Sequence, residues 1–203
     1  VYDYWWDTRN RKAYVFNPSN SSSKPKVLYD RNYQDIYSDP GSFLKARNTF
    51  NKNVLMLYKG NAYLRGAGFS KEGQFPFIDK LSITTLNKSR VYQSKYTDKV
   101  EAIQDYNPSN NELIVRIESP TEYPNYYSKK TNGKKLSKIT DFENPFKELQ
   151  NVKKEVITYK RDDGLELSGI LYLPVNYDEE KKEKAPMILW AYPREFKDRN
   201  SAS

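Results

Sequence analysis

The stretch that decides the predicted fold is EVITYKRDDGLELSGILYL, residues 155–173, followed by PMILWAY, residues 186–192. Residues 155–159 are mostly β-branched or aromatic, and a turn sequence ending in Gly164 follows them. Leucines and one glycine then occupy alternate positions of residues 165–173, which gives one apolar strand face. These features predict an antiparallel hairpin. The uninterrupted apolar run at 186–192 predicts a buried strand of a parallel sheet.

The part of the chain around this stretch predicts a domain boundary. A hairpin, a charged loop and a fully apolar strand, in that order, describe how the sheet of an α/β-hydrolase domain begins. One or two turns of helix are predicted over 145–152, just before the hairpin. We therefore expect two parts: residues 1–144, and residues 145–203 as the truncated start of an α/β-hydrolase domain.

The first 140 residues carry mainly strand signals, so the predicted fold class is mainly β. Short β-prone runs are separated by turns rich in Asn, Pro, Ser and Gly, and Asn132-Gly133 is the strongest short hairpin signal. Three hairpins, over 13–30, 80–94 and 126–141, share one layout. A repeat of about 40–50 residues built from four short strands is typical of a β-propeller blade. An antiparallel sandwich would contain similar hairpins, and the spacing alone leaves both architectures open.

Composition excludes several kinds of chemistry. The chain has no Cys and no His, so a thiolate zinc site, a cysteine nucleophile and a Ser-His-Asp triad cannot be built from these residues. The net charge is +8, but basic and acidic residues are interleaved, which argues against a nucleic-acid partner. No apolar run approaches the ~20 residues of a membrane span. The one dense basic cluster, Lys129, Lys130, Lys134, Lys135 and Lys138, is predicted to lie at an exposed hairpin end.

Several segments together resemble a known family. They are YKRDDGLEL (159–167), LYLP (171–174), WAYPREFK (190–197), DIYSDPGS (35–42) and the glycine-rich segment 66–79. Their pattern resembles the prolyl oligopeptidase family of serine peptidases, and residues 190–197 look like its glutamyl endopeptidase branch. The likeness is most specific at 159–197, moderate at 35–42 and 66–79, and architectural elsewhere.

The resemblance implies a β-propeller that caps an α/β-hydrolase domain with a Ser-Asp-His triad. Residues 1–144 would then be the last two or three blades. The nucleophile elbow, Gly-x-Ser-x-Gly, does not occur in the chain, so we expect these residues alone to be inactive. The implied partner is a peptide substrate, and no cofactor, metal, nucleic acid or membrane is expected. Open blade edges also predict self-association.

Two residues are candidates for a role in the chemistry implied by the resemblance. Tyr192 directly follows the apolar run, where a tyrosine of this family donates its hydroxyl to the oxyanion hole. Arg194, on the loop beyond, would provide a cation for a glutamate carboxylate. Strand-end packing of Tyr192 and a surface position of Arg194 beside Glu195 remain open alternatives. A further function class is a non-catalytic binding module for a glycan or an acidic protein.

Other short motifs favour ordinary turns. Gly66-Ala67-Gly68 lacks the third glycine and the helix of a phosphate-binding loop. Asp162-Asp163-Gly164 lacks the further ligands of a calcium loop, so a hairpin turn is predicted there.

Overall fold

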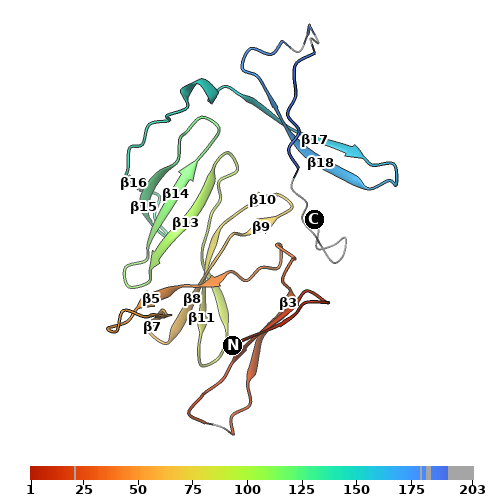
Figure 1. The fold of residues 1–203 in the computed structure, drawn as a ribbon. Coiled ribbons are helices and arrows are strands. Elements are labelled where there is room, and N and C mark those ends of the chain that lie inside the picture. Colours follow the sequence, from red (N-terminus) through yellow and green to blue (C-terminus); the bar gives the residue numbers. More distant parts are fainter. Residues whose placement is uncertain (21, 179, 182–183, 192–203) are drawn as a thin grey trace. The chain divides into compact units, whose positions relative to one another are not determined.

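The structure is a computed structural model that describes residues 1–20, 22–178, 180–181 and 184–191. The described residues form strands β1 to β18 and one short 3₁₀ helix, so the predicted mainly β class is confirmed. The chain divides into two compact units, Val1–Phe142 and a second unit that begins at Glu143. Figure 1 shows the strands of each unit.

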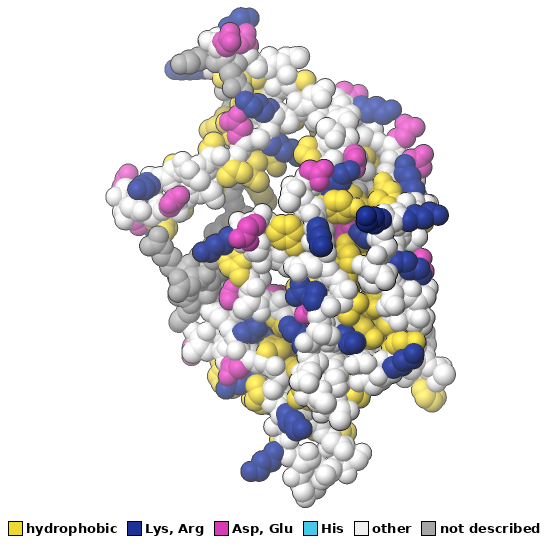
Figure 2. All heavy atoms as spheres, turned by 180° about the vertical axis from the view of Figure 1, so that it is seen from behind, with side chains coloured by type: hydrophobic (Ala, Val, Ile, Leu, Met, Phe, Trp, Pro, Cys, Tyr) yellow, Lys and Arg dark blue, Asp and Glu magenta, His cyan; other side chains and the backbone are white. Residues whose placement is uncertain are grey.

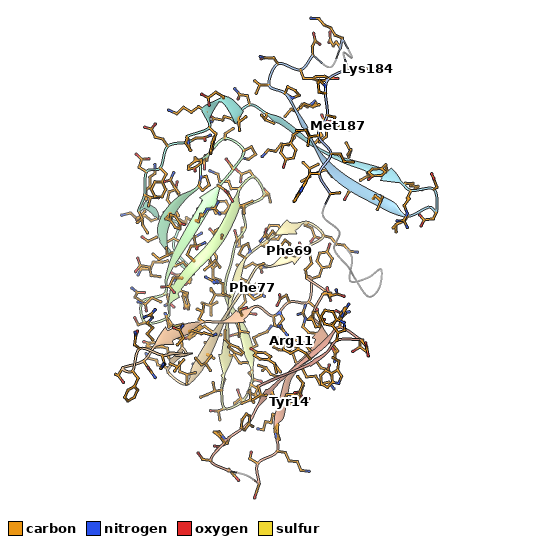
Figure 3. The ribbon with its side chains drawn as sticks, viewed as in Figure 1. Arg11, Tyr14, Phe69, Phe77, Lys184 and Met187 are labelled. Atoms are coloured by element: carbon orange, nitrogen blue, oxygen red, sulfur yellow. The ribbon has the colours of Figure 1, made fainter. Side chains whose placement is uncertain are left out.

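The first unit begins with a three-stranded antiparallel sheet of β1 (Tyr2–Trp5), β2 (Asn10–Val15) and β3 (Lys26–Asn32). The hairpin predicted over 13–30 is confirmed, because Ala13 pairs with Tyr29. Arg11 extends from β2 across this sheet, with its guanidinium 5.4–5.8 Å from the ring centroids of Tyr2, Tyr4 and Tyr29. Figure 3 labels Arg11 on this strand. Cation–π contacts therefore cover a sheet that has few aliphatic side chains.

A second sheet has the strand order β12 (Lys88–Gln93), β11 (Phe77–Ser82), β8 (Asn61–Gly66) and β4 (Ser42–Phe43), and β7 (Leu57–Tyr58) also pairs with β8. The turn between β7 and β8 has positive φ at both Lys59 (48°) and Gly60 (72°), as a tight hairpin turn requires. Two further pairs, β5–β6 and β9–β10, lie between these strands in sequence. The strands of this region are β4 (Ser42–Phe43), β5 (Lys45–Arg47), β6 (Asn53–Leu55), β7 (Leu57–Tyr58), β8 (Asn61–Gly66), β9 (Phe69–Ser70), β10 (Gly73–Gln74), β11 (Phe77–Ser82) and β12 (Lys88–Gln93).

The third sheet is a four-stranded antiparallel meander of β13 (Val100–Asn107), β14 (Glu112–Glu118), β15 (Asn125–Lys130) and β16 (Leu136–Lys138). The hairpin predicted around Asn132-Gly133 is confirmed, but it has a longer loop than a two-residue turn, because Lys129 pairs with Leu136. Gly133 has no positive φ, and its N–H donates to the Lys130 carbonyl at 3.1 Å. The loop therefore closes through a local backbone hydrogen bond.

The core of the first unit lies between the second and third sheets. Strict alternation along β14 buries Leu113, Val115 and Ile117. They form one cluster with Ile78 and four other buried residues, Tyr63, Tyr92, Ile103 and Tyr106. The rings of Tyr63 (β8) and Tyr106 (β13) lie 5.4 Å apart. The Arg65 guanidinium also donates to the Ile103 carbonyl at 3.0 Å, so the two sheets are joined by polar as well as apolar contacts.

The second unit contains a 3₁₀ helix, η1 (Lys147–Leu149), and the hairpin of β17 (Lys153–Lys160) and β18 (Glu166–Leu173). Pairing is continuous from Lys153–Leu173 to Lys160–Glu166, so the predicted hairpin is confirmed. On β18 the predicted apolar face is half-buried and the opposite face is exposed. Gly164 has a φ of +82° in the turn, a conformation that favours glycine.

The prediction of a buried parallel strand at 186–192 is wrong for residues 186–191, because these residues belong to no strand. The side chains of Met187 and Trp190 are 75% and 83% exposed. A parallel strand needs neighbours that accept its backbone hydrogen bonds, and no described residue pairs with this segment. Exposed apolar side chains are consistent with the predicted self-association, which stays a prediction.

The described residues give no evidence for closure of a sheet, so the propeller and the hydrolase domain also stay predictions. Within the described part, no helix has the length and apolar character needed to cross a membrane. On the face shown in Figure 2, basic and acidic side chains are interspersed with exposed hydrophobic ones.

Candidate functional site

The two site residues predicted from the sequence, Tyr192 and Arg194, lie outside the described residues. The description of this segment ends at Ala191, one residue earlier. Their suggested roles in the oxyanion hole and in carboxylate binding therefore stay predictions.

A buried polar cluster connects three strands of the first unit. Tyr92 (β12) donates its hydroxyl hydrogen to Glu101 Oε1 (β13) at 2.5 Å. Lys129 (β15) donates from Nζ to the Tyr92 hydroxyl at 2.7 Å and to Glu101 Oε2 at 2.9 Å. Each polar group of this Tyr92–Glu101–Lys129 cluster therefore contacts the other two.

The cluster is almost removed from water. The Glu101 side chain is fully buried and that of Lys129 is 12% exposed. Burial raises the pKa of the Tyr92 phenol, and its hydrogen bond to the Glu101 carboxylate raises it further. The Lys129 ammonium also lies 4.8 Å and 5.4 Å from the ring centroids of Tyr92 and Tyr96. The buried Glu101 carboxylate is thus compensated by the Lys129 ammonium and the Tyr92 hydroxyl, and the two ring faces stabilise the ammonium.

Sequence analysis missed this cluster and placed Lys129 incorrectly. Lys129 was expected at an exposed hairpin end, but it lies within the paired part of β15 opposite Leu113. The neighbouring Lys130 is exposed, as predicted, because alternate residues of a strand point to opposite faces. A signal was available in β13, where Glu101 shares the strand face of buried Ile103. A carboxylate at an inward position requires a buried partner.

A pocket of about 690 Å³ adjoins the cluster. Its basic lining residues are Arg90 and Lys95, in β12 and shortly after it, and Lys129 and Lys134, in β15 and the loop after it. Tyr96 also lines it. Lys129 is therefore shared between the buried cluster and the pocket wall. The residues that define the pocket are Arg90, Val91, Tyr92, Gln93, Lys95, Tyr96, Lys129, Thr131, Asn132, Gly133 and Lys134.

A second buried carboxylate lies on the neighbouring strand β11. The Asp79 side chain is 2% exposed and accepts a 2.5 Å hydrogen bond from Arg90 Nε. Lys88 Nζ lies 3.3 Å from the other carboxylate oxygen. The Arg90 guanidinium is also 4.0 Å from the centroid of the Phe77 ring. These contacts hold the Arg90 side chain, which is 40% exposed, at the pocket rim.

A smaller pocket, of about 280 Å³, lies beside Phe69 and Phe77, which Figure 3 labels. Lys88 and Arg90 also line it, and Asp39 adds a carboxylate. Acidic and basic groups therefore occur together here.

No cluster of three potential metal-ligating side chains occurs among the described residues.

At the turn before β18, Arg161 forms an ion pair with Asp163 and lowers the pKa of the Asp163 carboxyl to about 2. The Asp163 carboxylate also accepts the Leu165 N–H at 3.2 Å. The hairpin turn predicted at Asp162-Asp163-Gly164 is confirmed.

The arrangement around Lys129 favours binding over covalent chemistry. Lys129 Nζ already donates to the Tyr92 hydroxyl and to the Glu101 carboxylate, so both contacts would have to break before it could react with a substrate. The pocket instead presents positive charge along its wall, which can attract negatively charged groups.

The chain is similar over its full length to longer plant proteins. It is 36% identical, over 216 residues, to a protein of Oryza sativa subsp. japonica named "Probable glutamyl endopeptidase, chloroplastic". It is 34% identical, over 217 residues, to the Arabidopsis thaliana protein of the same name. Each alignment covers 100% of this chain and 23% of the plant protein. No family model matches the chain.

Among solved structures, the ligand-free AtxE2 isopeptidase aligns with 84% of this chain and 25% of its own, at 14% identity. A single-residue variant of this isopeptidase with Astexin3-dC4 bound aligns with 85% of this chain and 25% of its own, at 13% identity. The TM-score is 0.35 in both comparisons, which is too low to support an argument about fold. The chain spans about a quarter of the length of the two plant proteins, which are the curated relatives it matches.

Proposed function

We propose that this chain is part of a serine peptidase of the prolyl oligopeptidase type, in its glutamyl endopeptidase branch. The observation that carries the proposal is the 34–36% identity, along the entire chain, to two curated proteins named as glutamyl endopeptidases. The family likeness of residues 159–167 and 190–197 is independent of the geometry and points the same way.

In this proposal the first unit supplies blades of a β-propeller. The meander β13–β14–β15–β16 has the four antiparallel strands of one blade. The sheet before it packs against it through a shared apolar core, as neighbouring blades do. A propeller over the active site would restrict access to short or flexible peptides.

The second unit supplies the start of the hydrolase domain. Its hairpin, β17–β18, precedes the apolar segment at 186–191 in the chain. The catalytic Ser, Asp and His of the triad lie outside the chain, since the chain has no His and no Gly-x-Ser-x-Gly. Tyr192 contributes an oxyanion-hole hydroxyl, and Arg194 attracts the glutamate carboxylate of the substrate.

The coding sequence of the complete reading frame tests this proposal. We expect a Gly-x-Ser-x-Gly motif downstream of codon 203 and a His codon after it, in the order of an α/β-hydrolase. A complete reading frame without a nucleophile elbow or without a later His would contradict the proposal. That result would favour the non-catalytic binding module.

A further inference from the structure

We propose that the pocket between β12 and the β15–β16 loop binds a small anion carrying two or more phosphate or carboxylate groups. This goes beyond the peptidase proposal and does not depend on it, because the pocket lies entirely within the first unit. The shared chemistry is a cluster of negatively charged oxygens.

The first argument is charge. Among the described residues, the pocket lining contains four basic side chains, Arg90, Lys95, Lys129 and Lys134, and no acidic one. Asp79 and Glu101 compensate Arg90 and Lys129, but both carboxylates are buried. No ion pair of Lys95 or Lys134 occurs within the described part of the chain. These two exposed ammonium groups give the pocket its uncompensated positive charge.

The second argument is the rigidity of the wall. Lys129 is held by two hydrogen bonds and two ring contacts, and Arg90 by its hydrogen bond to Asp79 and its contact with Phe77. A cation fixed in advance loses little side-chain entropy when a ligand binds. The exposed Lys95 and Lys134, which come from two different segments of the lining, can then contact the ligand as well.

The third argument is size and shape. A volume of about 690 Å³ lies within the range of small-molecule sites, roughly 300–1,000 Å³. The half-buried Tyr96 ring adds an aromatic surface to the charged wall. Lysine ammonium groups bind phosphate and carboxylate as point charges, without demanding one geometry. The pocket therefore suits a compact anion with several charged groups.

Isothermal titration calorimetry of the protein with pyrophosphate and with citrate tests the proposal. The double variant Lys95→Ala/Lys134→Ala should raise the Kd for the bound anion at least ~10-fold, the scale of losing charged hydrogen bonds. The control variant Lys45→Ala/Lys52→Ala removes the same charge from the β5–β6 region and should change Kd less than ~2-fold. Far-ultraviolet circular dichroism verifies that both variants remain folded.

The outcomes separate the two sources of the anion. Tighter binding of pyrophosphate identifies a phosphate site, and tighter binding of citrate identifies a carboxylate site. Binding of neither anion by the unmodified protein would overturn the proposal. An equal loss in both double variants would also overturn it, because it would show a general effect of net charge.

Discussion

The interaction between Glu101 and Lys129 shows how one inward-facing carboxylate determines the position of a lysine on another strand. The Glu101 side chain is fully buried, so it cannot recover solvation if its partner is lost. Removing one member of a buried ion pair is costly because the remaining charge stays uncompensated. The exposed ion pair Lys99–Glu122, at 2.7 Å, offers a contrast in the same unit.

We predict that Lys129→Met lowers the free energy of unfolding by about 3–5 kcal/mol, measured by urea denaturation. The matched variant Lys99→Met should cost much less, because the Glu122 side chain is 50% exposed and remains solvated. Equal costs for the two variants would show that Lys129 contributes no more than a surface charge.

Buried tyrosines predict how stability responds to alkaline pH. Tyr106 is 2% exposed, and burial, with a smaller contribution from Tyr63, raises its pKa from 10.0 to about 12. Below pH 10 the phenol is neutral in both states, and its full contribution to stability is present. As the pH rises from 10 to about 12, the unfolded chain loses the proton first, so folding becomes less favourable.

We therefore predict that the free energy of unfolding falls above pH 10, measured by urea denaturation between pH 8 and 11. Tyr106→Phe removes one titrating group and should make this fall shallower. It also removes the 3.0 Å hydrogen bond to Asn111, so the slopes are compared rather than the absolute stabilities. An unchanged slope would exclude Tyr106 as a source of the fall.

Tyr192→Phe tests the proposed oxyanion-hole role in the intact peptidase. Removing only the hydroxyl should lower kcat by ~10²–10³, with a smaller effect on KM, because the bond forms fully in the transition state. The ring remains, so the melting temperature should change little. A Phe variant with the kcat of the unmodified enzyme would assign Tyr192 to packing.

At the scale of elements, two glycines with similar φ show the difference between the cost of backbone strain and the cost of a steric clash. Gly60 and Gly68 have φ of +72° and +68°. A Cβ on Gly60 meets no atom within 4 Å, whereas on Gly68 it would lie 1.9 Å from the Phe75 carbonyl oxygen. The Phe75 N–H donates to the Gly68 carbonyl at 2.8 Å, so that approach holds the β9–β10 pair closed.

We predict that Gly60→Ala costs about 1 kcal/mol, the strain of an alanine at positive φ. Gly68→Ala should cost on the order of 3 kcal/mol, because the backbone of Phe75 must also move. Thermal unfolding followed by circular dichroism measures both. A Gly68 variant no less stable than the Gly60 variant would contradict the close approach.

The elements that sequence predicted well are hairpins whose pairing partner is adjacent in the chain. The hairpins at 13–30 and 155–173 are set by alternation and by a turn, and all of this information is local. The strand predicted at 186–191 was wrong for the opposite reason, because an apolar run forms a strand only beside a neighbouring strand that it can pair with. The prediction that Lys129 is exposed was wrong because its burial depends on Glu101, 28 residues away. The basic residues next to Lys129 in the sequence carry no information about that distant partner.

At the scale of the whole molecule, the chain consists of two units that differ in burial. The first unit has a continuous core between two sheets, whereas the hairpin of the second contains no buried residue among its described strands. The boundary between the units lies after Phe142, and the assignment of residues 1–144 to a propeller and of 145–203 to a hydrolase domain stays a prediction. The proposed roles of Tyr192 and Arg194 come from the family resemblance alone, because both residues lie outside the described part of the chain.

The most direct test of the peptidase proposal is hydrolysis of a Glu-containing peptide, measured side by side for the 203-residue chain and for the protein encoded by the complete reading frame. The account predicts turnover by the complete protein that a serine-directed phosphonate blocks, and no turnover by the 203-residue chain, which has no His. Phosphonate-sensitive turnover by the purified 203-residue chain, or no turnover by the complete protein, would contradict it.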